Sequence, residues 1–195
     1  MVFLTNLEQE TLLKLFKEPY EEYNSNNLAI SVGKSRIGVS KALNSLEKNN
    51  LVTGKILGKA KFYKINYNDE YARKTIELLL MDESKKYPKW KDEFKEFQVK
   101  ILVIFGSIIK NEKEAQDIDI LIVYNEKDNE QINKIIKEKN SILTKKIHPI
   151  KQTYEDIKNN ILKKDKILIN AIKDGIVLKG QEEIVRLMQE VTSKK

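Results

Sequence analysis

Two apolar segments that lie close together in the second half of the chain constrain its fold most. Residues 99–105, VKILVIF, and residues 117–124, DIDILIVY, each have the length and composition of a β-strand. The residues between them are polar enough for one helical turn and a loop. We therefore expect two strands that this short connection brings together.

Two aspartates, Asp117 and Asp119, stand at the head of the second strand. Because side chains alternate along a strand, both are expected to project from the same face. Two carboxylates held side by side repel one another unless a cation lies between them or they share a proton. The pair is therefore a candidate metal site.

The rest of the composition restricts which metal this site could take. The chain has no cysteine and one histidine, which excludes disulfides, thiolate zinc sites, cysteine nucleophiles and histidine-cluster metal sites. Any bound metal is thus expected to be held by carboxylates and to be a hard ion, with Mg²⁺ or Mn²⁺ as the default.

A Gly-Ser pair, Gly106 and Ser107, ends the first strand. Gly106 lets the backbone approach a ligand closely, and Ser107 with the amides of the next turn can donate hydrogen bonds to phosphate. A triphosphate on these amides and a metal on the carboxylates would form one coherent site.

The segment 105–123, FGSIIKNEKEAQDIDILIV, resembles the minimal nucleotidyltransferases of the DNA polymerase beta superfamily. Gly106, Ser107, Asp117 and Asp119 are the matching positions. The resemblance implies a small mixed sheet, catalytic metal ligation by the two aspartates and phosphate binding by the Gly-Ser pair. It also implies transfer of a nucleoside monophosphate from a nucleoside triphosphate to a hydroxyl, with pyrophosphate as the leaving product. It extends more weakly to the last predicted helix, from residue 181 onward.

The chain departs from this family pattern at several positions. Lys110 or Asn111 stands where the family has a second glycine, Gln116 stands where serine usually precedes the first aspartate, and the spacer is about one residue shorter. A third carboxylate is expected on the strand after a helix at 129–140. The segment LTKKIHPIKQT has no acid there, and His148 occupies its place.

His148 has two interpretations. It is either a replacement general base, since imidazole titrates near neutrality, or a polar residue ahead of Pro149 at a strand end, and we favour the second. The nearby Glu155 and Asp156 are not assigned to catalysis, because Thr153 and Asp156 form a helix-start signature.

The first third of the chain has a different pattern. Residues 4–17 predict an amphipathic helix capped by Thr5 or Asn6, and residues 26–66 predict a short helix, a glycine turn, a longer helix and two short strands around Gly58. This order is typical of a winged helix-turn-helix, and the segment resembles those of prokaryotic transcription regulators. The inward face of the longer helix is predicted to comprise Ile37, Val39, Ala42, Leu43 and Leu46.

Basic residues are concentrated in this segment. Between residues 28 and 67 there are eight cations and one anion, an excess that equals the formal net charge of +7. Double-stranded DNA is therefore the expected partner, although winged helices also serve as protein-binding modules. The predicted DNA-binding residues are Lys34, Ser35, Arg36, Ser40, Lys41, Asn44, Lys59 and Lys61.

The predicted fold class is α+β, with three parts in the chain. Residues 1–82 form the winged-helix domain, including a helix at 68–81. Residues 83–98 form a linker and a connecting helix, where Trp90 packs between the domains or onto the following sheet, and residues 99–195 form the mixed-sheet α/β nucleotidyltransferase-like domain. No apolar run approaches the roughly 20 residues of a membrane-spanning helix. The protein is therefore expected to be cytoplasmic, without membrane contact. Winged helices that read DNA often pair across a two-fold axis, so a homodimer is also expected.

Three functions remain open from the sequence. The main hypothesis is a DNA-binding protein that transfers a nucleotide to a small molecule or a protein, with Mg²⁺ and a partner protein. The alternative is a transcription regulator whose second domain is inactive and serves ligand sensing or dimerisation. A third is a scaffold without either activity.

Overall fold

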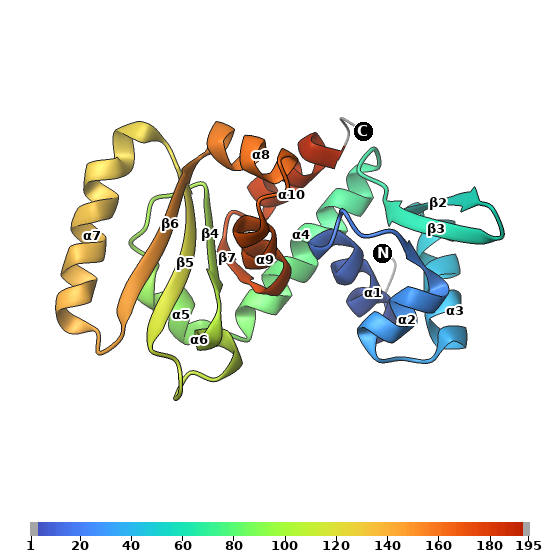
Figure 1. Ribbon diagram of the computed structural model, residues 1–195, viewed down its shortest axis with the longest axis horizontal. Helices are drawn as coiled ribbons and strands as arrows, with labels where there is room; N and C mark the ends of the chain where they lie inside the picture. Colours follow the sequence, from blue (N-terminus) through green and yellow to red (C-terminus); the bar gives the residue numbers. More distant parts are fainter. Residues whose placement is uncertain (1–3, 193–195) are drawn as a thin grey trace. The chain divides into compact units, whose positions relative to one another are not determined.

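The computed structural model describes residues 4–192. The chain divides into two compact units, residues 1–79 and residues 80–195 (Figure 1), and each is described by itself. The division falls within helix α4 (Glu70–Lys85). The sequence predicts that this helix ends at Met81, but it continues because residues 82–85 contain no helix breaker and Lys85 pairs with Asp82. The predicted domain limits stay a prediction.

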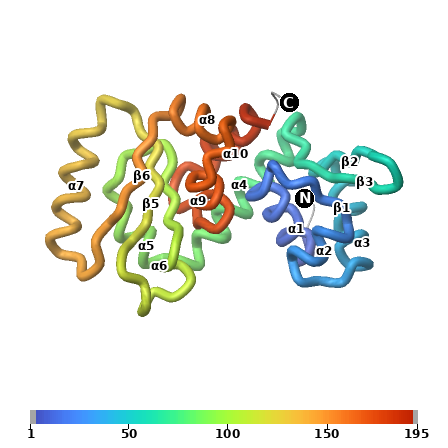
Figure 2. Tube along the Cα trace, in the orientation of Figure 1, coloured from blue at the N-terminus to red at the C-terminus, as the bar shows by residue number. Residues whose placement is uncertain are grey.

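The first unit consists of helices and a small antiparallel sheet in the order β1-β3-β2. Figure 2 shows the hairpin of β2 and β3 extending beyond the helices of this unit. This arrangement confirms the predicted winged helix-turn-helix fold. Its elements are α1 (Asn6–Lys17), β1 (Tyr23–Asn24), α2 (Ser25–Val32), α3 (Arg36–Lys48), β2 (Val52–Leu57) and β3 (Ala60–Ile65).

Local sequence signals set the ends of these elements. Thr5 caps α1 in a capping box with Glu8, which settles the choice between the two predicted caps. Gly33 adopts a left-handed conformation, with φ of 65°, and ends α2 before the turn into α3. Gly58, with φ of 62°, lies in the turn between β2 and β3.

The buried face of α3 confirms four of its five predicted core residues. Val39, Ala42, Leu43 and Leu46 are buried, at spacings of three and four residues. The prediction for Ile37 is wrong, because its side chain is 71% exposed. Ile37 precedes Val39 by two residues, which places it on the opposite side of a helix with 3.6 residues per turn.

The second unit is built on a mixed four-stranded sheet in the order β6-β5-β4-β7. β4 is antiparallel to both of its neighbours, whereas β5 and β6 are parallel and are connected through α7. The strands are β4 (Ile101–Phe105), β5 (Asp117–Tyr124), β6 (Lys146–Thr153) and β7 (Ile176–Lys179). The helices are α5 (Pro88–Glu93), α6 (Ser107–Lys110), η1 (Glu126–Asp128), α7 (Asn129–Ile142), α8 (Tyr154–Leu162), α9 (Lys166–Asp174) and α10 (Gln181–Thr192). The predicted mixed-sheet α/β fold is confirmed.

An aromatic cluster packs against one face of this sheet. Trp90 stacks on Phe94, their ring centroids 6.0 Å apart, and Phe94 meets Phe97 edge to face. These rings belong to the same buried cluster as Ile104 and Ile120 of the central strands. Of the two roles predicted for Trp90, packing onto the sheet is therefore the one observed.

Candidate metal and nucleotide site

The head of β5 positions the two predicted aspartates. Ile118 and Ile120 alternate with them and are buried, so the strand is anchored by its apolar face while Asp117 and Asp119 project from the other. Both aspartates are partly buried. The same-face arrangement expected from the alternation is confirmed.

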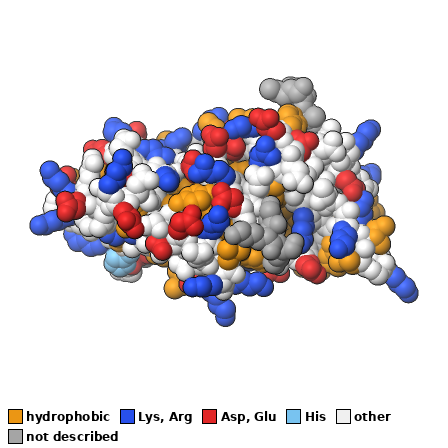
Figure 3. Space-filling view, turned by 90° about the horizontal axis from the view of Figure 1, so that it is seen from above, with side chains coloured by type: hydrophobic (Ala, Val, Ile, Leu, Met, Phe, Trp, Pro, Cys, Tyr) orange, Lys and Arg blue, Asp and Glu red, His pale blue; other side chains and the backbone are white. Residues whose placement is uncertain are grey.

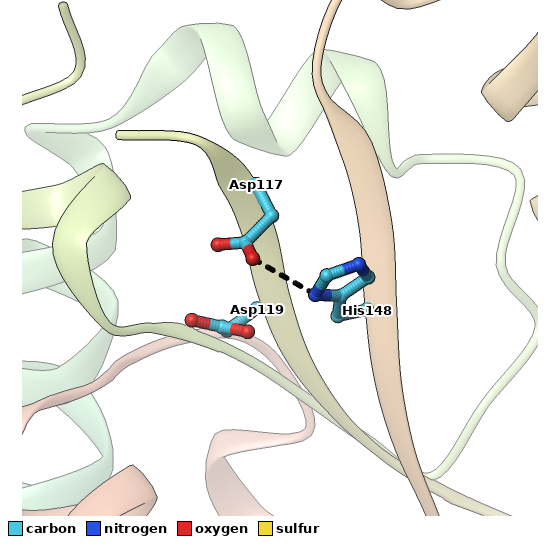
Figure 4. A group of neighbouring side chains, drawn as sticks. All are labelled: Asp117, Asp119 and His148. Atoms are coloured by element: carbon cyan, nitrogen blue, oxygen red, sulfur yellow. Dashed lines mark ion pairs between the residues drawn. The ribbon is translucent and has the colours of Figure 1, made fainter. Parts of the chain in front are cut away.

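The neighbouring strand adds His148 to this pair. In the parallel register of β5 and β6, His148 is the partner of Asp119. Its Nδ1 atom lies 2.9 Å from Asp117 Oδ2, and one ligand atom from each of the three residues lies within 4.8 Å of the others. Figure 4 shows the two carboxylates on β5 and the imidazole on β6 grouped beside the two strands.

Two sequence expectations for this site need correction. His148 is not at a strand end, since β6 begins at Lys146 and continues to Thr153. Pro149 does not end the strand because β6 is the edge of the sheet, where a residue without an N–H group is tolerated. The expectation that only carboxylates could hold a metal is also too narrow, because an imidazole completes the group of three.

Asp117 and Asp119 lie close enough together for the negative charge of one to affect the pKa of the other. Burial, followed by the negative charge of Asp117, raises the pKa of Asp119, and the nearby His148 offsets part of this rise. The ionised form of Asp119 is thus disfavoured in the folded protein without a cation. A divalent ion between the carboxylates would remove that repulsion, so the residues present fit a metal.

Gly106 makes room for one of these carboxylates. It lies between β4 and α6 with φ of 81° and ψ of −153°, a conformation almost restricted to glycine. A Cβ atom at this position would overlap Asp119 Oδ2. The pairing of Phe105 with Asp119 across β4 and β5 fixes this close approach. Ser107 follows as the first residue of α6, with its side chain exposed.

The connection between the strands is short but well anchored. Ile108 and Ala115 are buried in the core of the unit, and the Asn111 amide donates to the Ser107 carbonyl at 2.9 Å. Lys110 and Asn111, the two candidates for the place of the second glycine, and Gln116, in the place of serine, are all exposed. The departures from the pattern therefore do not disturb the packing that positions the head of β5.

The residues predicted to bind DNA lie on the helix-turn-helix and the wing. Those exposed on the turn and on α3 are Lys34, Ser35, Arg36, Lys41 and Asn44, and Ser40 is half-buried; Lys59, exposed, and Lys61, half-buried, lie on the wing. Figure 3 shows basic and acidic side chains mixed over the face in view, rather than one continuous basic surface.

Four of these residues also make contacts within the first unit. Asn44 Oδ1 accepts a hydrogen bond from the Tyr63 hydroxyl at 3.4 Å. Ser35 caps α3 by accepting a hydrogen bond from the Gly38 amide at 3.1 Å. The Nζ atom of Lys34 lies 3.4 Å from Oε2 of Glu10, as an ion pair. Lys61 pairs with Glu47, which raises the pKa of this lysine. The charges of Lys34 and Lys61 are therefore partly balanced, whereas no ion pair involves Arg36, Lys41 or Lys59 among residues 4–192.

The fold and the site together define the class of the second unit. A mixed sheet, a glycine at the end of β4 and two same-face aspartates at the head of β5 are the features of a nucleotidyltransferase domain. Residues 89–174 match the family model described as Polymerase beta, Nucleotidyltransferase. The chain thus combines a winged helix with a domain of the polymerase beta nucleotidyltransferase family, which accounts for less than half of its length.

Other comparisons add little. No curated protein matches the chain. Two solved structures of adhesin competence repressor (AdcR) from Streptococcus pyogenes are similar to it at low scores. One is 15% identical with a TM-score of 0.39, covering 72% of this chain and 80% of that chain. The other is 18% identical with a TM-score of 0.37, and the match covers 49% of this chain and 69% of that chain. Neither likeness supports a conclusion about function.

One general property follows from the helices. In the described part of the chain, none of them is both long and apolar enough to cross a membrane.

Proposed function

We propose that this protein binds DNA through its winged helix and transfers a nucleoside monophosphate from a nucleoside triphosphate to a hydroxyl acceptor. The observation that carries the enzymatic part is the crowded pair of Asp117 and Asp119 beside Gly106. The family match over residues 89–174 supports the same activity. The acceptor is a small molecule or a protein, and a partner protein would supply or present it.

Each residue of the site has a distinct part in this proposal. Asp117 and Asp119 would hold a divalent ion, Mg²⁺ or Mn²⁺. Such an ion, when bound, stabilises the charge that develops on the transferred phosphoryl group and its leaving oxygen. Gly106 leaves space for the Asp119 carboxylate and for the close approach of the nucleotide. Ser107 offers its exposed hydroxyl toward the phosphates.

Label transfer tests the proposed activity. Purified protein is incubated with α-phosphate-labelled ATP, GTP, CTP or UTP, with Mg²⁺, Mn²⁺ or a chelator, and with cell extract as a source of acceptor. We expect metal-dependent labelling that falls by roughly a hundredfold or more in Asp117→Asn and in Asp119→Asn. The matched control is Asp174→Asn, at an exposed aspartate that ends α9. Labelling that survives both substitutions at the site would contradict the proposal.

The DNA-binding part is supported by the exposed cations of α3 and the wing. Duplex DNA would contact Arg36, Lys41 and Lys59 through its phosphates, while Asn44 and Ser40 face the bases. Fluorescence anisotropy with labelled duplex DNA measures this binding. We expect the affinity to fall steeply as salt rises, since each phosphate contact releases counterions. Affinity that does not change with salt would favour the scaffold hypothesis.

One observation favours a second candidate function. β6 contributes no carboxylate beside Asp119 in the register of the two strands. A transcription regulator with an inactive nucleotidyltransferase domain would need only nucleotide binding or dimerisation from this unit. Calorimetry that detects nucleotide binding, together with no label transfer to any acceptor, would support this function over the first.

Assembly and location complete the proposal. Winged helices that read DNA commonly bind as pairs related by a two-fold axis, so we propose a homodimer. Light scattering after gel filtration gives the mass of the assembly directly.

We also propose that the protein is cytoplasmic, because its proposed ligands are DNA and nucleoside triphosphates. Fractionation of the source cells checks this location.

A further inference from the structure

Two carboxylates of β5 and one imidazole of β6 lie side by side, with one ligand atom from each within 4.8 Å of the others. They belong to Asp117, Asp119 and His148. We propose that Asp117, Asp119 and His148 form a three-residue metal site that selects Mn²⁺, or another first-row transition ion, over Mg²⁺. This inference rests on the proposed metal-dependent function and specifies its ion.

The sheet itself places the imidazole. β5 and β6 run parallel, and Asp119 and His148 are partners in their register. Residues that are partners in the register of two neighbouring strands share a face of the sheet, so His148 lies on the side from which both aspartates project. The position of the third ligand is therefore fixed by backbone pairing and does not depend on a loop.

The distances within the group fit shared coordination. His148 Nδ1 lies 2.9 Å from Asp117 Oδ2. Two ligand atoms on adjacent positions of one ion, each about 2.1 Å from it, lie about 3 Å apart. One pair of ligand atoms thus already has the spacing of adjacent ligands on one ion, and the ligand atom of Asp119 lies within 4.8 Å of both.

The surroundings leave the aspartates available. Within residues 4–192, no lysine or arginine forms an ion pair with Asp117 or Asp119. The two lysines that precede His148 on or next to β6 are engaged elsewhere: Lys145 donates to the Ala115 carbonyl and Lys146 to the Asn140 carbonyl. The space that Asp119 needs is provided by Gly106, where a side chain would overlap it.

The chemistry of the ligands decides which ion the site prefers. Mg²⁺ binds oxygen ligands and water almost exclusively, whereas imidazole suits the first-row transition metals. Replacement of a third carboxylate by a neutral imidazole also removes one negative charge, which weakens the attraction of a hard ion. Mn²⁺ accepts both oxygen and imidazole ligands, so the site retains it while losing affinity for Mg²⁺.

Electron paramagnetic resonance of Mn²⁺ tests the site without any measurement of activity. Bound Mn²⁺ is titrated with and without a non-hydrolysable nucleoside triphosphate analogue, Mg²⁺ is added as competitor, and electron spin echo modulation detects a coordinated ¹⁴N. We expect nitrogen coupling in the wild type, and its loss with about tenfold or more weaker Mn²⁺ binding in His148→Gln. Lys146→Gln, two residues earlier on β6, is the matched control and should behave as the wild type.

A second variant tests the selectivity in the opposite direction. His148→Asp supplies a third carboxylate at the same position, so the preference for Mn²⁺ over Mg²⁺ should shrink and the nitrogen coupling should vanish. Thermal melts of all variants confirm that they are folded.

The outcomes separate this inference from the proposed function. Mn²⁺ binding that requires Asp119 but shows no nitrogen coupling would overturn the inference and leave the transferase proposal intact. Absence of any Asp119-dependent Mn²⁺ binding, with the analogue present, would also overturn it. Nitrogen coupling in a protein that transfers no label would support the metal site and count against the transferase.

Discussion

Gly106 and Asp119 lie so close together that a side chain at position 106 would overlap the Asp119 carboxylate. The two come from adjacent antiparallel strands, where Phe105 pairs with Asp119. The backbone of Gly106 also has φ of 81° and ψ of −153°, which other residues rarely adopt. Glycine is therefore required at this position twice, once for its conformation and once for the carboxylate.

Gly106→Ala is expected to damage both stability and function. The backbone strain alone costs about 1–3 kcal/mol, and the new methyl group displaces Asp119 from its place beside Asp117. Chemical denaturation and label transfer measure the two effects. Gly33→Ala is the control, because Gly33 has φ of 65° but a methyl group there would meet no atom within 4 Å. It should lose about 1–2 kcal/mol and keep its transferase activity.

The pH dependence of stability follows from Asp119. Burial and the charge of Asp117 raise the pKa of this carboxyl above the ordinary value of 3.8. A group that binds its proton more tightly when folded stabilises the protein fully below pH 3.8 and loses that contribution as the pH rises through its raised pKa. Without metal, the folded protein therefore bears the cost of an ionised Asp119 at neutral pH.

Asp119→Asn should thus raise the melting temperature of the metal-free protein at pH 7, and the difference from the wild type should disappear toward pH 3.8. Added Mn²⁺ should reverse the order, since only the wild type retains both carboxylates. Circular dichroism melts across this range, with a chelator or with Mn²⁺, measure both effects. A variant that is less stable than the metal-free wild type at pH 7 would refute the argument.

The sequence predicts local features of the site well. The bounds of β5 and the shared face of its aspartates follow from alternation along one strand. The helix start at Thr153 is confirmed, because Thr153 and Asp156 form a capping box in the structure. These features depend on residues within a few positions of one another, where spacing alone carries the information.

Features that depend on pairing between distant segments could not be predicted from local spacing. The pairing of β5 with β6 brings His148 beside Asp119, and only the family resemblance, which puts His148 in the place of a third carboxylate, indicated this position. The two-residue strand β1 exists only because Tyr23 pairs with Tyr63 of β3. Likewise, the closeness of Gly106 to Asp119 arises from the pairing of β4 with β5, not from the Gly-Ser sequence.

The wing offers a test of which cations meet DNA. Lys61 is paired with Glu47 and lies over the Tyr63 ring, 5.4 Å from its centroid, whereas Lys59 has no ion-pair partner in the described residues. Lys59→Ala should weaken DNA binding and lower the salt slope by about one unit, while Lys61→Ala should change both less. Anisotropy titrations at several salt concentrations measure the slopes. Equal losses from the two substitutions would show that DNA displaces Glu47 from Lys61.

Substitutions of Ile37 and Leu43, both on α3, distinguish an effect on DNA binding from an effect on folding. The Ile37 side chain is 71% exposed at the start of α3, whereas Leu43 is fully buried. Leu43→Ala should destabilise the first unit by about 2–5 kcal/mol, while Ile37→Ala should change stability by no more than about 0.5 kcal/mol.

If α3 enters the major groove, Ile37 is placed to contact thymine methyl groups, so Ile37→Ala should reduce the affinity for a preferred duplex by about 1 kcal/mol. It should leave the affinity for non-specific DNA nearly unchanged, because that binding depends on the phosphates and not on apolar contacts. Urea denaturation and competition titrations give the two quantities. Equal loss on both DNAs would place Ile37 outside the groove, and an unchanged affinity with altered oligomeric mass would make its exposed side chain part of a protein interface.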